Sequence, residues 1–168
     1  MILLIVVGLV ALQRSLEMFY AARNTRALLA RGAVEVAPQQ HGYFIALHAA
    51  WLVSMLVLVP WDRIPNWWLI GAFAVLQLLR VWVIRTLGPY WTTRIITIAD
   101  APLVRRGPYR CMRHPNYAIV AAELAVLPLA FGAWTLALLF TILNAALLTW
   151  RIRTENTALQ ERRSRPSP

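Results

Sequence analysis

The chain has 168 residues, of which 60% are hydrophobic and 14% are charged, and its mean hydropathy is +0.56. Soluble domains carry about 25% charged residues and about 45–50% apolar ones. The apolar residues of this chain come in long runs, and each transmembrane helix needs about 20 of them. The composition therefore predicts one integral membrane domain covering residues 1–168, and it excludes a soluble dinucleotide-binding enzyme.

The net charge of +10 comes from 17 arginines against 7 acidic residues, because the chain contains no lysine. A charge this positive raises the question of nucleic-acid binding. The arginines lie between the apolar runs and form no single polar face, so nucleic acid is not expected as a partner. The single cysteine, Cys111, excludes an internal disulfide.

Five apolar segments predict an all-α, polytopic fold with five transmembrane helices. The N-terminal run lacks the basic start and the small-residue cleavage site of a signal peptide, so we take it as the first helix. Pro60 ends the second segment, and Gly88-Pro89 ends the third. The turn at Phe131-Gly132 is short, so the last two segments should form an antiparallel C-terminal hairpin. The segments are residues 2–29, 43–59, 67–87, 116–130 and 133–160.

The number of arginines alternates between the connections, and this alternation predicts the orientation in the membrane. Cytoplasmic connections carry the excess of basic residues, and the four connections and the tail carry 3, 1, 5, 0 and 5 arginines in order. This pattern places the N-terminus outside a bacterial inner membrane and the C-terminus in the cytosol, with the tail against anionic lipid headgroups. The arginines counted are Arg23, Arg26 and Arg31, then Arg63, then Arg94, Arg105, Arg106, Arg110 and Arg113, and finally Arg151, Arg153, Arg162, Arg163 and Arg165.

Several ionisable side chains fall inside the predicted helices, where a charge costs at least about 2.5–3.5 kcal/mol. Such groups pair or line a cavity, and Arg14 can pair with Glu17, three residues along the same helix. Glu123 is a candidate partner for Arg80 from another helix. These residues are either polar contacts between helices or the lining of a polar pocket, and the sequence leaves both open. The polar residues inside the segments are Arg14, Glu17, His48, Gln77, Arg80, Glu123 and Asn144.

Two polar blocks lie at the cytosolic ends of the last two predicted helices. The first is residues 107–117, GPYRCMRHPNY, in which Pro115 suits the first turn of a helix. Arg113 and His114 would then lie at the N-terminus of this helix, where an anionic ligand group is favoured. The second is residues 151–159, RIRTENTAL, which the expected hairpin brings to the same pocket. One stripe of the last helix passes through Asn144, Leu148, Arg151 and Glu155.

The two blocks resemble the signature of the isoprenylcysteine carboxyl methyltransferase family of membrane enzymes, which phospholipid methyltransferases share. The family motif is an RHPxY block, a helical hairpin and an R-x-x-x-E-E-x-x-L block, and the resemblance covers residues 104–160. Asn156 stands where the family has its second Glu, so the role of that position is left open. Residues 23–51 are similar to a bacterial branch of the family, whose members O-methylate alkylresorcinols or alkylpyrones.

The resemblance implies S-adenosylmethionine as the cofactor, bound on the cytosolic side between the last two helices. It implies O-methyl transfer to a carboxylate or phenol of a lipophilic acceptor that enters from the membrane, with no metal. A phenol has a pKa of about 10 and needs a base or a cation beside it, whereas a carboxylate needs no base. The catalytic residue is unknown, with His41, His48 and Glu123 as candidates. The residues implied to bind the cofactor are Tyr109, Arg113, His114, Tyr117, Arg151 and Glu155.

Two other functions remain open on the sequence alone. Membrane sterol reductases that use NADPH have a related C-terminal architecture, and the basic residues 94–113 suit the extra phosphate of that cofactor. The chain is short for that group. A non-catalytic membrane protein is the third alternative, and Asn156 is the feature that favours it.

Overall fold

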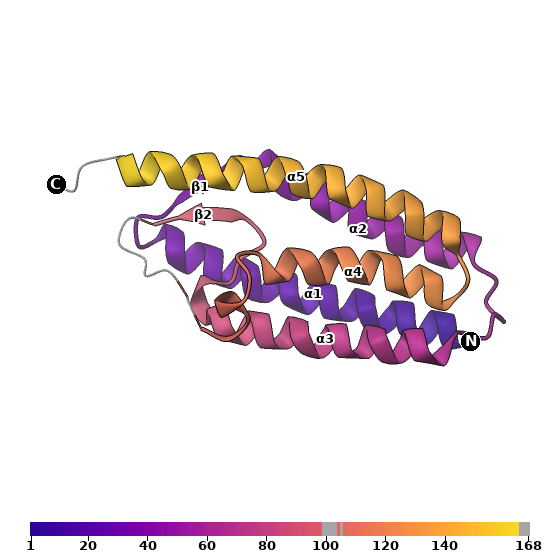
Figure 1. Cartoon of the computed structure of the whole chain (residues 1–168). Coiled ribbons are helices and arrows are strands. Elements are labelled where there is room, and N and C mark those ends of the chain that lie inside the picture. Colours follow the sequence, from indigo (N-terminus) through magenta and orange to yellow (C-terminus); the bar gives the residue numbers. More distant parts are fainter. Residues whose placement is uncertain (99–103, 105, 165–168) are drawn as a thin grey trace.

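The computed structural model describes residues 1–98, 104 and 106–164. Its long helices lie along one direction, with a small strand pair at one end (Figure 1). Arg105 and Arg165 of the charge pattern lie outside the described residues. The elements in chain order are α1 Ile2–Leu29, β1 Val34–Val36, α2 Gln39–Leu58, α3 Trp67–Leu87, the 3-10 helix η1 Gly88–Tyr90, β2 Ile95–Thr97, the 3-10 helix η2 Gly107–Arg110, α4 Pro115–Ala130 and α5 Trp134–Ser164.

The helices follow the predicted segments closely. α1 and α3 have the predicted bounds. α3 begins after Asn66, whose side chain accepts hydrogen bonds from the backbone N–H groups of Trp68 and Leu69 and so caps the helix. α2 begins four residues earlier than predicted, at Gln39, because the chain turns into the helix at Pro38 and polar residues make the first turn.

The strands β1 and β2, of three residues each, are an addition to the mostly helical fold that the sequence predicted. They pair antiparallel, with Val36 opposite Ile95. Arg94 Nη1 lies 2.8 Å from Glu35 Oε1, so an ion pair also joins the two strand segments. The β-branched residues of both segments suit this extended pairing. The resulting ribbon ties the connection after α1 to the connection after α3.

Contacts between distant parts of the chain define the two ends of the helix bundle. At one end, which we call the Met1 end, the Met1 ammonium donates to the Trp61 carbonyl at 2.7 Å. The Asn66 N–H donates to the Ala130 carbonyl there, also at 2.7 Å. The opposite end carries β1 and β2, and we call it the ribbon end. α1, α3 and α5 run from the Met1 end toward the ribbon end, whereas α2 and α4 run back (Figure 1).

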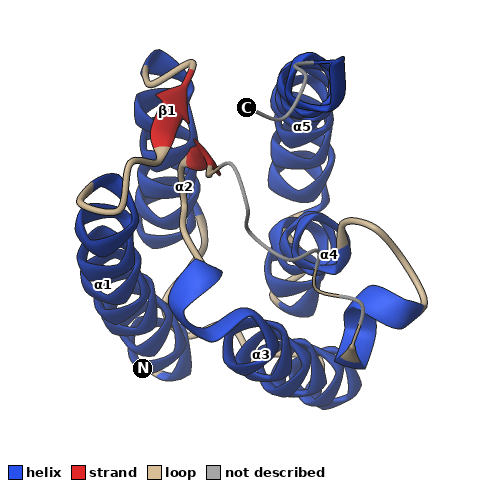
Figure 2. Ribbon diagram, turned by 90° about the vertical axis from the view of Figure 1, so that its left-hand side faces the viewer, coloured by secondary structure: helices blue, strands red, loops and turns tan. Residues whose placement is uncertain are grey.

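Seen along the helices, α1, α2, α5, α4 and α3 follow one another around the bundle (Figure 2). The apolar core between them includes the fully buried Trp51, Met55 and Leu124. The outer faces of the helices instead expose many large apolar side chains, such as Leu9 and Val57. An apolar surface of this extent marks a face that is covered by another apolar phase, here lipid.

Within the described residues, four helices are long and apolar enough to cross a membrane, namely α1, α2, α3 and α5. α4 has 16 residues. This corresponds to about 24 Å of helix, against about 30 Å for the hydrocarbon core. Trp61, Trp67 and Trp68 are exposed at the Met1 end, where an aromatic belt at the membrane surface is expected. Helix length therefore supports four of the five predicted crossings.

Charged side chains join α1, α3 and α4 in the middle of the bundle. Arg80 Nε donates to Glu17 Oε1 at 2.7 Å, and Arg80 Nη1 donates to Glu123 Oε2 at 3.3 Å. Arg14 donates to Glu17 Oε2 at 3.1 Å and also to Glu123. Gln77 Nε2 donates to Glu123 Oε1 at 2.9 Å. The predicted pairs are confirmed, and these five residues, the ionic cluster, act as polar contacts between helices.

Candidate functional site

A glycine that packs against α3 positions the segment before α4. Gly107 has a φ of +57°, and a Cβ atom there would lie 2.8 Å from Thr86 Oγ1. Both conditions favour glycine. After η2, which carries Tyr109, α4 begins at Pro115 with His114 as its N-cap residue, as predicted. The segment therefore lies against the end of α3 and leads into α4 at the ribbon end.

Tyr117, in the first turn of α4, connects the two polar blocks. Its hydroxyl accepts a hydrogen bond from Arg151 Nε and donates one to Glu155 Oε2, each at 2.9 Å. Arg151 is buried, whereas 28% of the Glu155 side chain is exposed. Hydrogen bonds to ionised groups are stronger than neutral ones. This chain of bonds therefore fixes α4 against α5 where both blocks lie.

The His114 ring adds an aromatic surface beside the Glu155 carboxylate. His114 stacks on Tyr117, with ring centroids 5.1 Å apart and an interplanar angle of 7°. Its Nδ1 lies 3.8 Å from Glu155 Oε2, and the His114 side chain is 26% exposed. The three side chains thus combine aromatic faces with a negative charge at a partly exposed position. This combination suits a cationic ligand group.

Tyr109 and Arg113 complete the set of predicted binding residues. Burial raises the pKa of Tyr109 to about 12, and the charge of the Glu155 carboxylate adds to this shift. The Tyr109 hydroxyl is therefore protonated at neutral pH and can donate a hydrogen bond. Arg113 is exposed and, within the described part of the chain, makes no ion pair. The structure thus brings Tyr109 near Glu155 and leaves Arg113 at the solvent edge.

α2 and the chain before β2 contribute residues that are not part of the two polar blocks. The guanidinium carbon of Arg151 lies 5.2 Å from the centroid of the Phe44 ring, and Arg151 Nη2 donates to the Thr93 carbonyl at 3.0 Å. Gln40, almost fully buried, donates from Nε2 to Thr154 Oγ1 at 2.9 Å. The spacing of four between Gln40 and Phe44 is a sequence signal for one face of α2. The Thr93 carbonyl belongs to the backbone and leaves no such signal.

Comparison with known proteins assigns this arrangement to a family. The model of the isoprenylcysteine carboxyl methyltransferase (ICMT) family matches residues 69–161, more than half of the chain. The chain belongs to this family. The uncharacterized protein YpbQ of Bacillus subtilis (strain 168) is 37% identical over 161 residues, which is 94% of this chain and 96% of the relative. No solved structure matches the chain.

The ICMT family consists of membrane methyltransferases, and S-adenosylmethionine is the cofactor of its enzymes. The matched residues include both polar blocks, so the resemblance predicted from them is confirmed. Together with the long apolar helices, the family identifies an integral membrane protein. Asn156, which departs from the family motif, is exposed on α5 beside Glu155.

The structure separates the candidates for a catalytic base in this ICMT-family protein. His41 lies in the first turn of α2 beside Gln40, which contacts α5, so it lies at the ribbon end. His48 lies about two turns further into the bundle, and its Nδ1 donates to the Phe44 carbonyl at 2.8 Å. Glu123 belongs to the ionic cluster, where both of its oxygens accept hydrogen bonds. The contacts of Glu123 are therefore those of a structural residue that joins helices.

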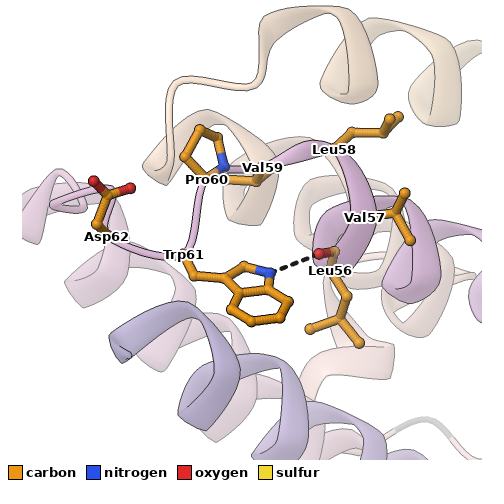
Figure 3. A pocket seen from close by; sticks show the side chains of 7 residues that line it. All are labelled: Leu56, Val57, Leu58, Val59, Pro60, Trp61 and Asp62. Atoms are coloured by element: carbon orange, nitrogen blue, oxygen red, sulfur yellow. Dashed lines mark hydrogen bonds between the residues drawn. The ribbon is translucent and has the colours of Figure 1, made fainter.

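An open pocket of about 620 Å³ lies at the opposite end of the bundle, the Met1 end (Figure 3). It is lined by residues 56–62, which close α2 and begin the following connection. Trp61 Nε1 donates to the Leu56 carbonyl at 2.8 Å, and both residues line the pocket (Figure 3). This pocket contains none of the residues of the ICMT motif, so it is separate from the candidate site.

Proposed function

We propose that this ICMT-family protein is an S-adenosylmethionine-dependent methyltransferase that acts on an oxygen of a lipophilic acceptor. The observation that carries the proposal is the contact between the two family blocks, in which Tyr117 of α4 joins Arg151 and Glu155 of α5. Methyl transfer is an in-line displacement that needs an aligned donor and acceptor and little water. A fixed junction of α4 and α5 beside the membrane supports both requirements.

The residues at the ribbon end fit the chemistry of this cofactor. S-adenosylmethionine carries a carboxylate, an ammonium and a sulfonium, so its site needs charges of both signs. Glu155 offers a negative charge, Arg113 offers a positive one, and His114 and Tyr117 offer stacked aromatic faces. Cations are attracted to such faces. The donor set therefore supports binding of the whole amino-acid end of the cofactor.

Two buried oxygen atoms give further support. Gln40 Oε1 and Asn116 Oδ1 are buried and have no hydrogen-bond partner among the described residues. Gln40 bonds to α5 through its amide nitrogen, and Asn116 lies in the first turn of α4. Both oxygens accept hydrogen bonds only. They are thus available to donors of a bound molecule, such as an amino group or a ribose hydroxyl.

Each side chain has a role in this proposal. When bound, the cofactor supplies an electrophilic methyl group on its sulfonium. Arg113 and the N-terminus of α4 bind its carboxylate, and Glu155 binds its ammonium or a ribose hydroxyl. The protonated hydroxyl of Tyr109 donates a hydrogen bond, while buried Arg151 holds Tyr117 in position.

The proposed acceptor is a lipophilic carboxylic acid or phenol that enters from the bilayer. The similarity of the N-terminal part to the bacterial branch that modifies alkylresorcinols and alkylpyrones supports an acidic hydroxyl on an alkylated ring. Such a hydroxyl needs a base or a neighbouring cation. His41, in the first turn of α2, is the candidate at the ribbon end, with His48 about two turns deeper.

We also propose that α4 is a fifth crossing and forms a transmembrane hairpin with α5. α4 starts at the ribbon end, and its last carbonyl, that of Ala130, accepts a hydrogen bond at the Met1 end. α4 therefore reaches across the bundle although it is short. The alternation of arginines supports a cytosolic ribbon end and an external Met1 end.

A matched pair of variants on α5 tests the proposed site. Arg151 is buried against Tyr117, whereas Arg153, two residues along, is exposed. A hydrogen bond to a charged group contributes about 1.5–3 kcal/mol. We therefore expect Arg151→Gln to bind S-adenosylhomocysteine at least tenfold more weakly in calorimetry, and Arg153→Gln to bind as the wild type does. Equal affinity of wild type, Arg151→Gln and Glu155→Gln would contradict the site.

The product identifies the acceptor oxygen. Purified protein with radiolabelled S-adenosylmethionine and a panel of long-chain phenols and carboxylic acids should place label in the organic phase. Alkaline treatment releases methanol from a methyl ester but not from an aryl methyl ether, so retention of the label indicates a phenol. Label on a thiol or carbon acceptor, with none on oxygen, would contradict O-methyl transfer.

A further inference from the structure

Two buried side chains deep in the bundle have hydrogen-bonding groups without partners. Trp51 on α2 and Asn144 on α5 are fully buried. Trp51 Nε1, Asn144 Oδ1 and Asn144 Nδ2 have no hydrogen-bond partner among the described residues. A buried polar group without a partner destabilises a protein, and an apolar side chain of the same shape would avoid this cost. An indole and an amide at these positions therefore point to a bound group that completes their hydrogen bonds.

The packing of α2 on α5 places the two side chains opposite each other. Phe44 of α2 lies against the Arg151 guanidinium of α5. Seven residues make about two helical turns and return to the same face. On antiparallel helices, seven residues forward from Phe44 and seven back from Arg151 lead to Trp51 and Asn144. Figure 1 shows α2 and α5 side by side along this length.

The position of this pair suits a lipophilic molecule that extends inward from the candidate site. Asn144 lies about 10 Å along α5 from Arg151, given a rise of 1.5 Å per residue. Leu148, between them on the same stripe, is buried and offers an apolar wall. Small exposed residues lie at the same level on both helices, among larger exposed ones such as Val53 and Leu143. The small residues are Ala49, Ala50, Ala145 and Ala146.

We propose that Trp51 and Asn144 bind an uncharged hydroxyl group of the acceptor, which can accept from both N–H donors and donate to Asn144 Oδ1, and thereby set its depth below the cofactor. The indole N–H only donates, whereas the amide both donates and accepts. Neither side chain is charged, so a neutral group suits the pair better than an ion, whose burial is costly. The inference rests on the proposed function, because it assigns a binding site to the acceptor of that reaction.

Calorimetric titration with 4-dodecylphenol tests the inference on the full-length protein in mild detergent, without cofactor. Loss of one hydrogen bond should weaken binding about tenfold, so we expect this reduction in both Asn144→Leu and Trp51→Phe. Thr149→Val is the matched control, because it removes a hydroxyl from the exposed face of α5. It should bind as the wild type does. Dodecylbenzene, which has no hydroxyl, should bind equally to all four proteins.

Equal affinity of the wild type and both variants for 4-dodecylphenol overturns the inference, and so does a wild type that shows no saturable binding of this probe. Melting curves establish that each variant is folded, and if Asn144→Leu fails to fold, Trp51→Phe alone decides. S-adenosylhomocysteine is titrated separately into the same proteins and should bind all of them equally. Its failure to bind the wild type contradicts the proposed function, whereas the 4-dodecylphenol comparison still decides the role of Trp51 and Asn144.

Discussion

Removal of Arg80 should destabilise the protein strongly, because it leaves two buried carboxylates with one arginine. Arg80 donates to both oxygens of Glu17 and to Glu123, and 5% of the residue is exposed. Breaking a buried ion pair from one side costs about 3–5 kcal/mol. At about 2–4 °C per kcal/mol for a chain of this size, Arg80→Met should lower the melting temperature by about 6–20 °C. Arg85→Met, exposed on the same helix, is the control and should melt with the wild type.

The double variant Arg80→Met/Glu17→Gln tests the physical reason for this loss. It restores electrical neutrality, because Arg14 and Glu123 remain as a pair. We therefore expect the double variant to melt at a higher temperature than Arg80→Met alone, although it carries one more substitution in the cluster. Circular dichroism of the purified proteins in detergent measures both melting temperatures. A double variant that melts below Arg80→Met would contradict charge imbalance as the cause of the loss, and an unchanged melting temperature of Arg80→Met would contradict the loss itself.

Three further predictions concern other parts of the chain. Gly107→Ala should destabilise the protein by about 1–3 kcal/mol in thermal melting, because its Cβ meets Thr86 Oγ1 at a positive φ; adding Thr86→Ala should recover part of the loss, and no recovery would exclude the contact as the cause. Cys111, exposed at the ribbon end, should react with a membrane-impermeant maleimide in inside-out vesicles but not on intact cells, and the opposite pattern would invert the topology. Without ligand, Asn144→Leu should stabilise the protein by up to about 1–3 kcal/mol and so raise its melting temperature. A melting temperature below that of the wild type would show that the Asn144 amide is already hydrogen-bonded.

The helices were predictable because apolar runs and their end signals determine them locally. Asn66 caps α3, and Pro115 opens α4 in the first turn, so both starts were visible in the sequence. The ribbon was not predictable, since strands of three residues give no periodic pattern. Val36 and Ile95 pair across 59 positions of sequence, and only the packed helices bring them together.

The candidate site was predictable in part for the same reason. The link between Tyr117 and Glu155 follows from two motif blocks on helices joined by a short turn. The contribution of α2 could not be derived from those blocks, because Phe44 reaches Arg151 only through the packing of α2 on α5. The Arg14 to Glu123 contact likewise depends on where α1 and α4 lie in the bundle. Pairing of buried charges was expected, but the geometry of the tertiary contacts decides which charges meet.

The most direct test of the proposed methyltransferase function is a calorimetric titration of the purified wild-type protein with S-adenosylhomocysteine. NADPH is titrated in parallel. The proposed methyltransferase predicts saturable binding of S-adenosylhomocysteine with a stoichiometry of about one and no binding of NADPH. Binding of NADPH alone would contradict the account and favour a reductase of related architecture. Binding of neither ligand to protein that melts cooperatively would contradict a catalytic role for the site around Tyr117 and Glu155.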